Sequence, residues 1–179
     1  SLVNNPASPI TFDNLTLNTN GGKGLYAVGL KQLIVSGGKI TSVGAPAVDI
    51  SGSTINTTFS SISVNGGPLG INLSQSAGSF NILGGGSVGT GGTIYNTIIG
   101  LSIDTFGVAN INWVNFTNNG VAIHSSKSNQ LDLAGLQITG STGYALESHS
   151  DSTLILSQSI LTNNGALGGG TILIQGDTV

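Results

Sequence analysis

The chain has 179 residues, of which 38% are hydrophobic and only 6% are charged, with 29 glycines and a net charge of −3. Low charge combined with ample Val, Ile and Leu excludes an intrinsically disordered chain, which needs high charge and few apolar side chains. The chain has four lysines and no arginine, so we expect no nucleic-acid partner, because neutralising phosphates requires clusters of Lys and Arg.

Cysteine is absent, so disulfides and thiolate sites are unavailable. Apolar runs such as 154–156 are far shorter than the roughly 20 residues that span a bilayer, so we expect no membrane insertion of this segment. No signal peptide precedes Ser1 and methionine is absent, and we therefore expect a chain excised or processed from a longer protein.

Short strands are predicted along the whole chain, because apolar residues alternate with small polar ones. The clearest segments are Ile10-Thr11-Phe12, Leu15-Thr16-Leu17, Leu131-Asp132-Leu133 and Leu136-Gln137-Ile138. Between the strands lie segments rich in Asn and Gly, which permit positive φ and hence tight corners: 18–22, 65–68, 84–86, 118–120 and 163–165. No segment has a sustained helical stripe, so the pattern predicts an all-β fold.

Seven apolar residues recur at intervals of 22 to 28 residues: Leu17, Ile40, Val64, Val88, Phe116, Ile138 and Leu161. A second series ends Gly-x-x-aliphatic or related segments at residues 27, 50, 73, 103, 123 and 146. A period of this size indicates a structural unit that stacks on itself. The two series predict a right-handed parallel β-helix, or β-solenoid, of about seven coils of 20–28 residues, forming one domain over residues 1–179.

Aligning consecutive coils predicts which side chains stack, since equivalent residues of adjacent coils lie about 4.8 Å apart. The predicted columns are Ala109, Leu131 and Leu154; Ile111, Leu133 and Leu156; Val114, Leu136 and Ser159; and Phe116, Ile138 and Leu161. The longest intervals predict one inserted loop, in either 89–93 or 104–107. Residues 1–9 are expected to form an N-terminal cap or linker, and 171–175 is expected to be a bare strand at the other end. A bare strand predicts either further β-helix sequence in a longer protein or end-to-end association of copies.

The segments Phe59-Ser60-Ser61-Ile62-Ser63-Val64-Asn65-Gly66-Gly67 and Phe116-Thr117-Asn118-Asn119-Gly120 resemble the right-handed parallel β-helix repeats of large bacterial surface and secreted proteins. The resemblance covers about residues 9–175. Phe116-Thr117-Asn118-Asn119 followed by Gly120-Val121-Ala122-Ile123 is also similar to the repeat signatures of chlamydial polymorphic membrane autotransporters, although Val121 replaces their second glycine. The resemblance implies an extracellular or cell-surface adhesin-like or scaffold segment.

The main concentration of polar residues is expected on two adjacent coils, because aligning Ile123 with Leu146 places His124 beside Glu147 and Ser126 beside His149. The candidate site comprises His124, Lys127, Glu147, His149 and Asp151. One interpretation is a glycan-binding or metal-assisted site, since His and carboxylate groups ligate divalent ions. The other is a solvated corner whose His124–Glu147 pair is an ordinary exposed ion pair.

Catalysis is not expected, and neither is a cofactor. Inverting glycosidases need two carboxyl groups about 6.5–9.5 Å apart, and four strand residues would separate Glu147 from Asp151 by about 13 Å unless a corner intervenes. Trp113 could contact sugar or pack between coils. We therefore expect a structural stalk, adhesin segment or filament building block, with surface glycans or further copies of the chain as partners. The alternative is a carbohydrate-binding or carbohydrate-active β-helix that resembles lyases, glycosidases or phage tailspikes.

Overall fold

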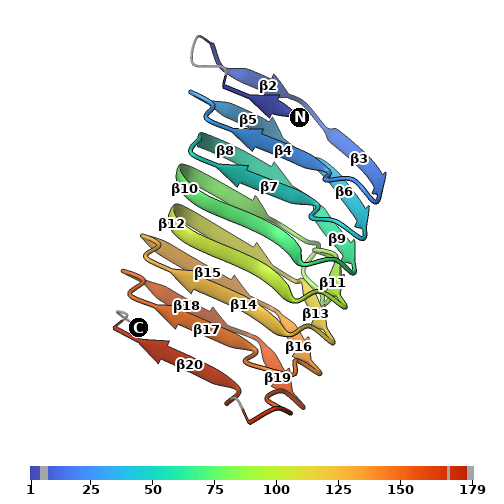
Figure 1. The fold of residues 1–179 in the computed structure, drawn as a ribbon, viewed down its shortest axis with the longest axis vertical. Coiled ribbons are helices and arrows are strands. Elements are labelled where there is room, and N and C mark those ends of the chain that lie inside the picture. Colours follow the sequence, from blue (N-terminus) through green and yellow to red (C-terminus); the bar gives the residue numbers. More distant parts are fainter. Residues whose placement is uncertain (5–7, 169, 177–179) are drawn as a thin grey trace.

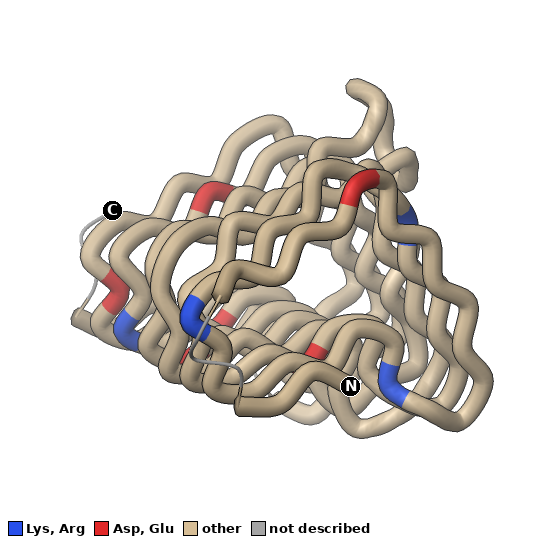
Figure 2. The backbone as a smooth tube through the Cα atoms, turned by 90° about the horizontal axis from the view of Figure 1, so that it is seen from above, with Lys and Arg blue, Asp and Glu red and all other residues tan. Residues whose placement is uncertain are grey.

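The computed structural model describes residues 1–4, 8–168 and 170–176, and these form a parallel β-solenoid of about seven turns without a helix. The coils stack along one axis (Figure 1), and each complete coil contributes a strand, or half of a long strand, to each of three faces. Seen along that axis, the coils enclose a three-sided interior, and the few charged residues are spread over the coils without forming a cluster of one sign (Figure 2). This confirms the predicted all-β stacked architecture.

Face 1 contains the strands that begin each coil. They are β1 (Leu2–Val3), β4 (Leu25–Val28), β7 (Val48–Ser51), the first half of β10 (Leu69–Ile82), the first half of β12 (Ile99–Asn112), β14 (Val121–Ser126), β17 (Leu146–His149) and β20 (Ile172–Gln175). All neighbours pair in parallel, as successive turns of one coil require. The long strands β10 and β12 continue around the corner into face 2.

Face 2 contains β2 (Ile10–Phe12), β5 (Leu33–Ser36), β8 (Thr54–Phe59), the second halves of β10 and β12, β15 (Gln130–Ala134) and β18 (Leu154–Ser157). Face 3 contains β3 (Leu15–Asn20), β6 (Gly38–Val43), β9 (Ser61–Asn65), β11 (Thr93–Tyr95), β13 (Asn115–Thr117), β16 (Gln137–Thr139) and β19 (Ile160–Thr162). Inward and outward side chains alternate along these strands, so each face has one buried and one solvated side.

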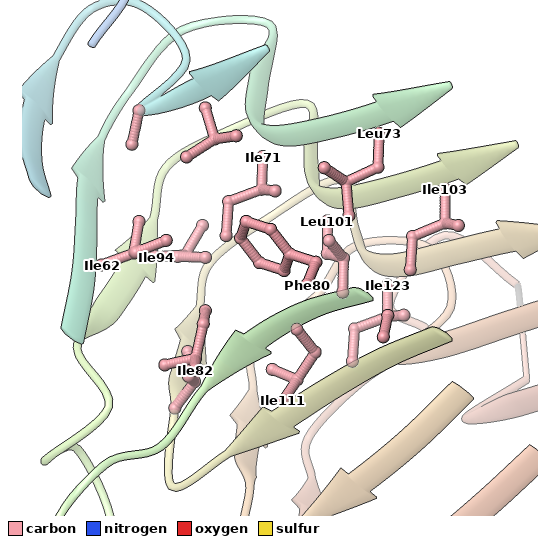
Figure 3. Packing of buried hydrophobic residues seen from close by; sticks show 14 of the residues in the cluster. Ile62, Ile71, Leu73, Phe80, Ile82, Ile94, Leu101, Ile103, Ile111 and Ile123 are labelled. Atoms are coloured by element: carbon pink, nitrogen blue, oxygen red, sulfur yellow. The ribbon is translucent and has the colours of Figure 1, made fainter. Parts of the chain in front are cut away.

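The interior consists of columns of aliphatic and aromatic side chains, one from each coil. Side chains from all three faces converge on this interior, as Ile71, Phe80 and Ile94 do in the middle coils (Figure 3). One complete column on face 1 is Leu25, Val48, Ile71, Leu101, Ile123, Leu146 and Ile172. Most inward residues of the middle coils are 0% exposed, so each coil depends on both of its neighbours for its burial.

Three of the four columns predicted for consecutive coils on faces 2 and 3 are confirmed. Ala109, Leu131 and Leu154 pair in register, and so do Ile111, Leu133 and Leu156. Phe116, Ile138 and Leu161 likewise form one column on face 3.

The longer predicted series need three corrections. Val88 is 42% exposed in a loop, and Ile94 takes its place between Val64 and Phe116. Leu17 and Ile40 stack on Ile62, one inward position away from Val64. On face 1, residues 27, 50, 73 and 103 form one column, but 123 and 146 belong to the neighbouring column two residues earlier in the strand. An interval alone cannot distinguish adjacent inward positions, because they differ by only two residues.

The inserted loop occupies residues 83–92, between β10 and β11. Within it the Thr90 hydroxyl accepts from the Gly85 N–H and donates to the Ser87 carbonyl. The alternative location at 104–107 is wrong, because these residues continue β12 and pair along β10. The irregularity at that point is in β10, whose register shifts between Ser76 and Ser79.

Polar side chains reach across the corners to the backbone of the preceding coil. Ser53 Oγ accepts from the Leu30 N–H at 3.0 Å between faces 1 and 2, and Ser159 Oγ accepts from the Leu136 N–H at 3.0 Å between faces 2 and 3. Between faces 3 and 1, buried Asn119 accepts from the Thr97 N–H at 3.0 Å. These bonds satisfy backbone donors that the strand ladders leave unpaired where the chain turns.

Aliphatic side chains are exposed at the C-terminal coil. Ile172 and Ile174 continue inward columns, yet they are 43% and 38% exposed, and Leu156 is 36% exposed. At the opposite end, Leu2 pairs with Ala27 as the first strand of face 1 and packs against the core. Of the predicted cap at residues 1–9, residues 5–7 lie outside the described part of the chain.

Candidate functional site

His124, Glu147 and His149 come together on the outer side of face 1. His124 lies in β14 and pairs in register with Glu147 in β17, and Ser126 pairs in the same way with His149. Ile123 and Leu146 point into the core just before His124 and Glu147. Because side chains alternate along a strand, both His124 and Glu147 point outward, and His149 does so two residues further along β17. The predicted adjacency is confirmed.

The glutamate bridges the two histidines. Glu147 Oε2 is 3.2 Å from His124 Nδ1, and Glu147 Oε1 is 3.1 Å from His149 Nε2. The centroids of the two imidazole rings are 5.9 Å apart. The side chains are 32%, 23% and 28% exposed for His124, Glu147 and His149 respectively, so the cluster is shielded by its neighbours but still reached by solvent.

Two opposing effects act on the pKa of Glu147. Partial burial raises the pKa. Hydrogen bonds from His149 and His124, together with their positive charge, lower it by more, so that the pKa lies below its ordinary value of 4.5. The carboxyl group is therefore ionised at neutral pH. In this ionised form the carboxylate can accept hydrogen bonds from the two imidazoles or bind a cation.

Lys127 and Asp151, the other two candidates, lie at the corner between faces 1 and 2. Lys127 is exposed in a turn with φ of +57°, and its backbone N–H donates to the His149 carbonyl at 3.0 Å. Asp151 is only 2% exposed, and its Oδ1 accepts from the Ser128 N–H at 2.7 Å. Its Oδ2 accepts from the Ser148 hydroxyl. The structure therefore places Asp151 inside the corner and not on the outer patch where the sequence suggested it.

The buried position of Asp151 has a structural explanation. Between the same two faces, Ser53 and Ser76 accept the N–H groups of Leu30 and Ser53 from the preceding coils. Asp151 likewise accepts the N–H group of Ser128, which lies in the preceding coil. The carboxylate thus takes part in the backbone hydrogen bonding of the corner, and it does not face the same surface as Glu147.

A second polar cluster on face 1 was not predicted. Asp49 lies in the same outward column as His124 and Glu147, closer to the N-terminal end, and it forms an ion pair with Lys23 and accepts from the Asn72 amide at 2.8 Å. Lys23 also lies 4.1 Å from the centroid of the Tyr26 ring. The signal in the sequence was the 23-residue interval from Tyr26 to Asp49 and from Asp49 to Asn72.

Trp113 packs between coils. A side chain at Gly135 of the next coil would collide with its ring, and one at Gly84 would collide with its Cβ and Cδ1 atoms. These glycines leave the space that the indole fills. The packing role, one of the two considered for this residue, accounts for its position.

His124, Glu147 and His149 each offer one atom suited to metal binding, and these atoms lie within 4.8 Å of one another. Comparisons of the chain with protein-family models, with curated proteins and with solved structures found no match. Among the described residues, no helix has the length and apolarity that a membrane crossing requires.

Proposed function

We propose that this chain is a non-enzymatic structural segment: a rigid β-solenoid rod that joins end to end with further copies and serves as a stalk, adhesin segment or filament building block at a bacterial surface. The observation that carries the proposal is the exposed C-terminal coil. Its inward residues Ile172 and Ile174 remain 43% and 38% exposed, although they continue buried columns. Another coil stacked on this surface would bury them.

On face 1, both ends of the rod carry an aliphatic side chain in the same inward column. The inward column that ends at Ile174 begins at Leu2, through Ala27, Ile50, Leu73, Ile103, Ser125 and Ser148. A second copy stacked in the same direction would place its Leu2 next to Ile174, aliphatic on aliphatic. The edge of β20 also offers backbone groups to the incoming strand β1, as exposed sheet edges do. Such head-to-tail contact does not close on itself and generates filaments.

The site geometry supports a non-enzymatic role. Glu147 points outward, whereas Asp151 is buried and bonded to the corner backbone, so the two carboxylates do not flank a common cleft. Glu147 is itself engaged by two histidines. Glu147 and Asp151 therefore do not provide the pair of carboxyl groups on which glycosidases of this chemistry depend.

Sedimentation velocity over a range of protein concentrations, combined with negative-stain electron microscopy, tests the proposal. We expect linear oligomers that lengthen with concentration. Ile174→Lys should abolish them, because it places a charge in the stacked column, whereas Ile98→Lys should not, because Ile98 is 68% exposed on a middle coil.

A chain that remains monomeric at every concentration would contradict end-to-end assembly, and so would equal loss of assembly in both variants. Binding on a glycan array that is abolished by His124→Ala would favour the carbohydrate-binding alternative.

A further inference from the structure

We propose that His124, Glu147 and His149 form a binding site for one divalent transition-metal ion of the zinc class. The proposal is independent of whether the rod assembles, since all three residues belong to one chain and to two adjacent strands. It rests on the positions of three ligand atoms, on the rigidity of the strands that carry them and on the chemistry of the ligands.

The two separations between the Glu147 carboxylate and the imidazole nitrogens are close to those between two ligands of one metal ion. Two atoms that each lie about 2.1 Å from one ion are about 3.4 Å apart at a tetrahedral angle and about 3.0 Å apart at a right angle. The observed separations from Glu147 oxygens are 3.2 Å to His124 Nδ1 and 3.1 Å to His149 Nε2. One ligand atom from each of the three residues lies within 4.8 Å of the others, so binding requires the side chains to rotate until one carboxylate oxygen and both nitrogens reach a common ion.

The backbone around the ligands is held on both sides. β17 pairs with β14 on one edge and with β20 on the other, so Glu147 and His149 lie in the interior of the sheet. His124 is in β14, which pairs with β12 and β17. Inward neighbours such as Ile123 and Ser148 are fully buried, which fixes the direction of the outward side chains. A site on paired strands loses little backbone entropy when it binds a ligand.

The set of donors selects the kind of metal. Two imidazole nitrogens and one carboxylate suit Zn²⁺, Co²⁺, Ni²⁺ and Cu²⁺, whereas Ca²⁺ and Mg²⁺ prefer sites made wholly of oxygen ligands. The charge of Glu147 offsets part of the charge of the ion. Three protein ligands leave at least one coordination position for water or for a group from another molecule. Partial exposure of all three side chains gives the ion access from solvent.

An alternative explanation for the cluster is a hydrogen-bonded ion pair without metal. The two explanations differ in what happens to His124 Nδ1 and His149 Nε2. In an ion pair both nitrogens carry protons that point toward Glu147, whereas a bound metal replaces both protons. Whether His124 Nδ1 and His149 Nε2 carry a proton or a metal ion therefore distinguishes the two explanations.

The first experiment is isothermal titration of the untagged chain with Zn²⁺, with Ca²⁺ and Mg²⁺ as comparison ions. We expect one Zn²⁺ per chain and no saturable binding of Ca²⁺ or Mg²⁺. His124→Ala and His149→Ala should each weaken Zn²⁺ binding by at least about 100-fold. Removing a residue that only hydrogen-bonds to a metal ligand already lowers metal affinity by about 10- to 100-fold, and loss of a ligand should lower it at least as much. The matched control is Asp49→Asn, which removes a carboxylate from the same outward column far from the cluster and should leave binding unchanged.

The second experiment needs no variant and so does not depend on whether the variants fold. Nitrogen-15 spectra of the imidazole side chains of the native chain report on its two histidines. Zn²⁺ should shift Nδ1 of His124 and Nε2 of His149 while the other ring nitrogens change little. Unshifted nitrogens in the presence of excess Zn²⁺ would overturn the proposal, as would Zn²⁺ affinity that both folded alanine variants retain.

Discussion

Two leucines in one column allow the contribution of stacking to stability to be measured directly. Leu133 is 0% exposed, with Ile111 stacked on one side and Leu156 on the other. Leu156, one coil further along, has the same chemistry and the same inward direction but is 36% exposed. Leu133→Ala and Leu156→Ala therefore differ in the presence of a following face 2 strand, within the described part of the chain, and not in residue type.

The expected losses differ by a factor of about three. Leu133→Ala leaves a cavity that its neighbours can fill only in part, so the free energy of unfolding should fall by about 3 kcal/mol. Leu156→Ala leaves a space open to water, without a cavity term, and removes side-chain atoms that are already partly hydrated. We expect a loss of about 1 kcal/mol for that variant.

Guanidinium unfolding followed by far-ultraviolet circular dichroism measures both losses, at a protein concentration low enough to keep the chain monomeric. Amide hydrogen exchange shows whether the destabilisation is centred on β15 or spreads along the rod. Equal losses for the two variants would refute the reasoning, because they would mean that a following coil adds nothing to the burial of the preceding one.

Two further substitutions test the corners, by the same unfolding assay. Gly92→Ala should lower the free energy of unfolding by at least about 2 kcal/mol, because its φ of +109° is unfavourable for a residue with a side chain and a Cβ would strike the Ile62 carbonyl oxygen. The control Gly22→Ala, where a Cβ would meet no atom within 4 Å, should change it by less than about 0.5 kcal/mol. Similar losses for the two variants would contradict the backbone argument. Asn119→Ala should also lower the free energy of unfolding by at least about 2 kcal/mol, because it removes the Asn119 acceptor of the buried Thr97 N–H and the Asn119 donor to the Ile94 carbonyl. An unfolding midpoint equal to that of the exposed control Asn20→Ala would show that these corner bonds contribute little.

The stacked architecture was predictable from the sequence because parallel coils place equivalent residues at nearly constant intervals. The column of Phe116, Ile138 and Leu161 follows from intervals of 22 and 23 residues, and the structure confirms it. Register was harder to predict where an insertion changed the interval. Val88 preserved the rhythm of the sequence but lies in the inserted loop, and Ile94 fills the interior instead. The alternation of apolar and polar residues marks candidate inward positions. The path of the inserted loop decides which candidate, Val88 or Ile94, enters the core.

The corners account for the remaining error at the candidate site. Along a strand, alternation fixes the direction of a side chain, and it correctly placed His124 and Glu147 together on the outer surface. Asp151 follows the positive-φ residue Ser150, where the chain turns and the alternation no longer applies. Its direction is set by the Ser128 N–H that it bonds, an acceptor role that Ser53 and Ser76 fill with hydroxyls in earlier coils.

The same distinction between strands and corners explains why the histidine–glutamate cluster occurs in the middle of a sheet and not in a loop. A parallel ladder brings residues 23 positions apart to adjacent strands, so a pair such as His124 and Glu147 needs no folded loop to hold it. His149 joins them because residues two apart in a strand share a face. In this geometry Ser102 and Leu173 occupy the column on either side of the cluster, and neither offers a second carboxylate or imidazole. The three proposed ligands are therefore a local change in two adjacent outward columns, and substitutions there can alter the proposed metal binding without disturbing the columns of the core.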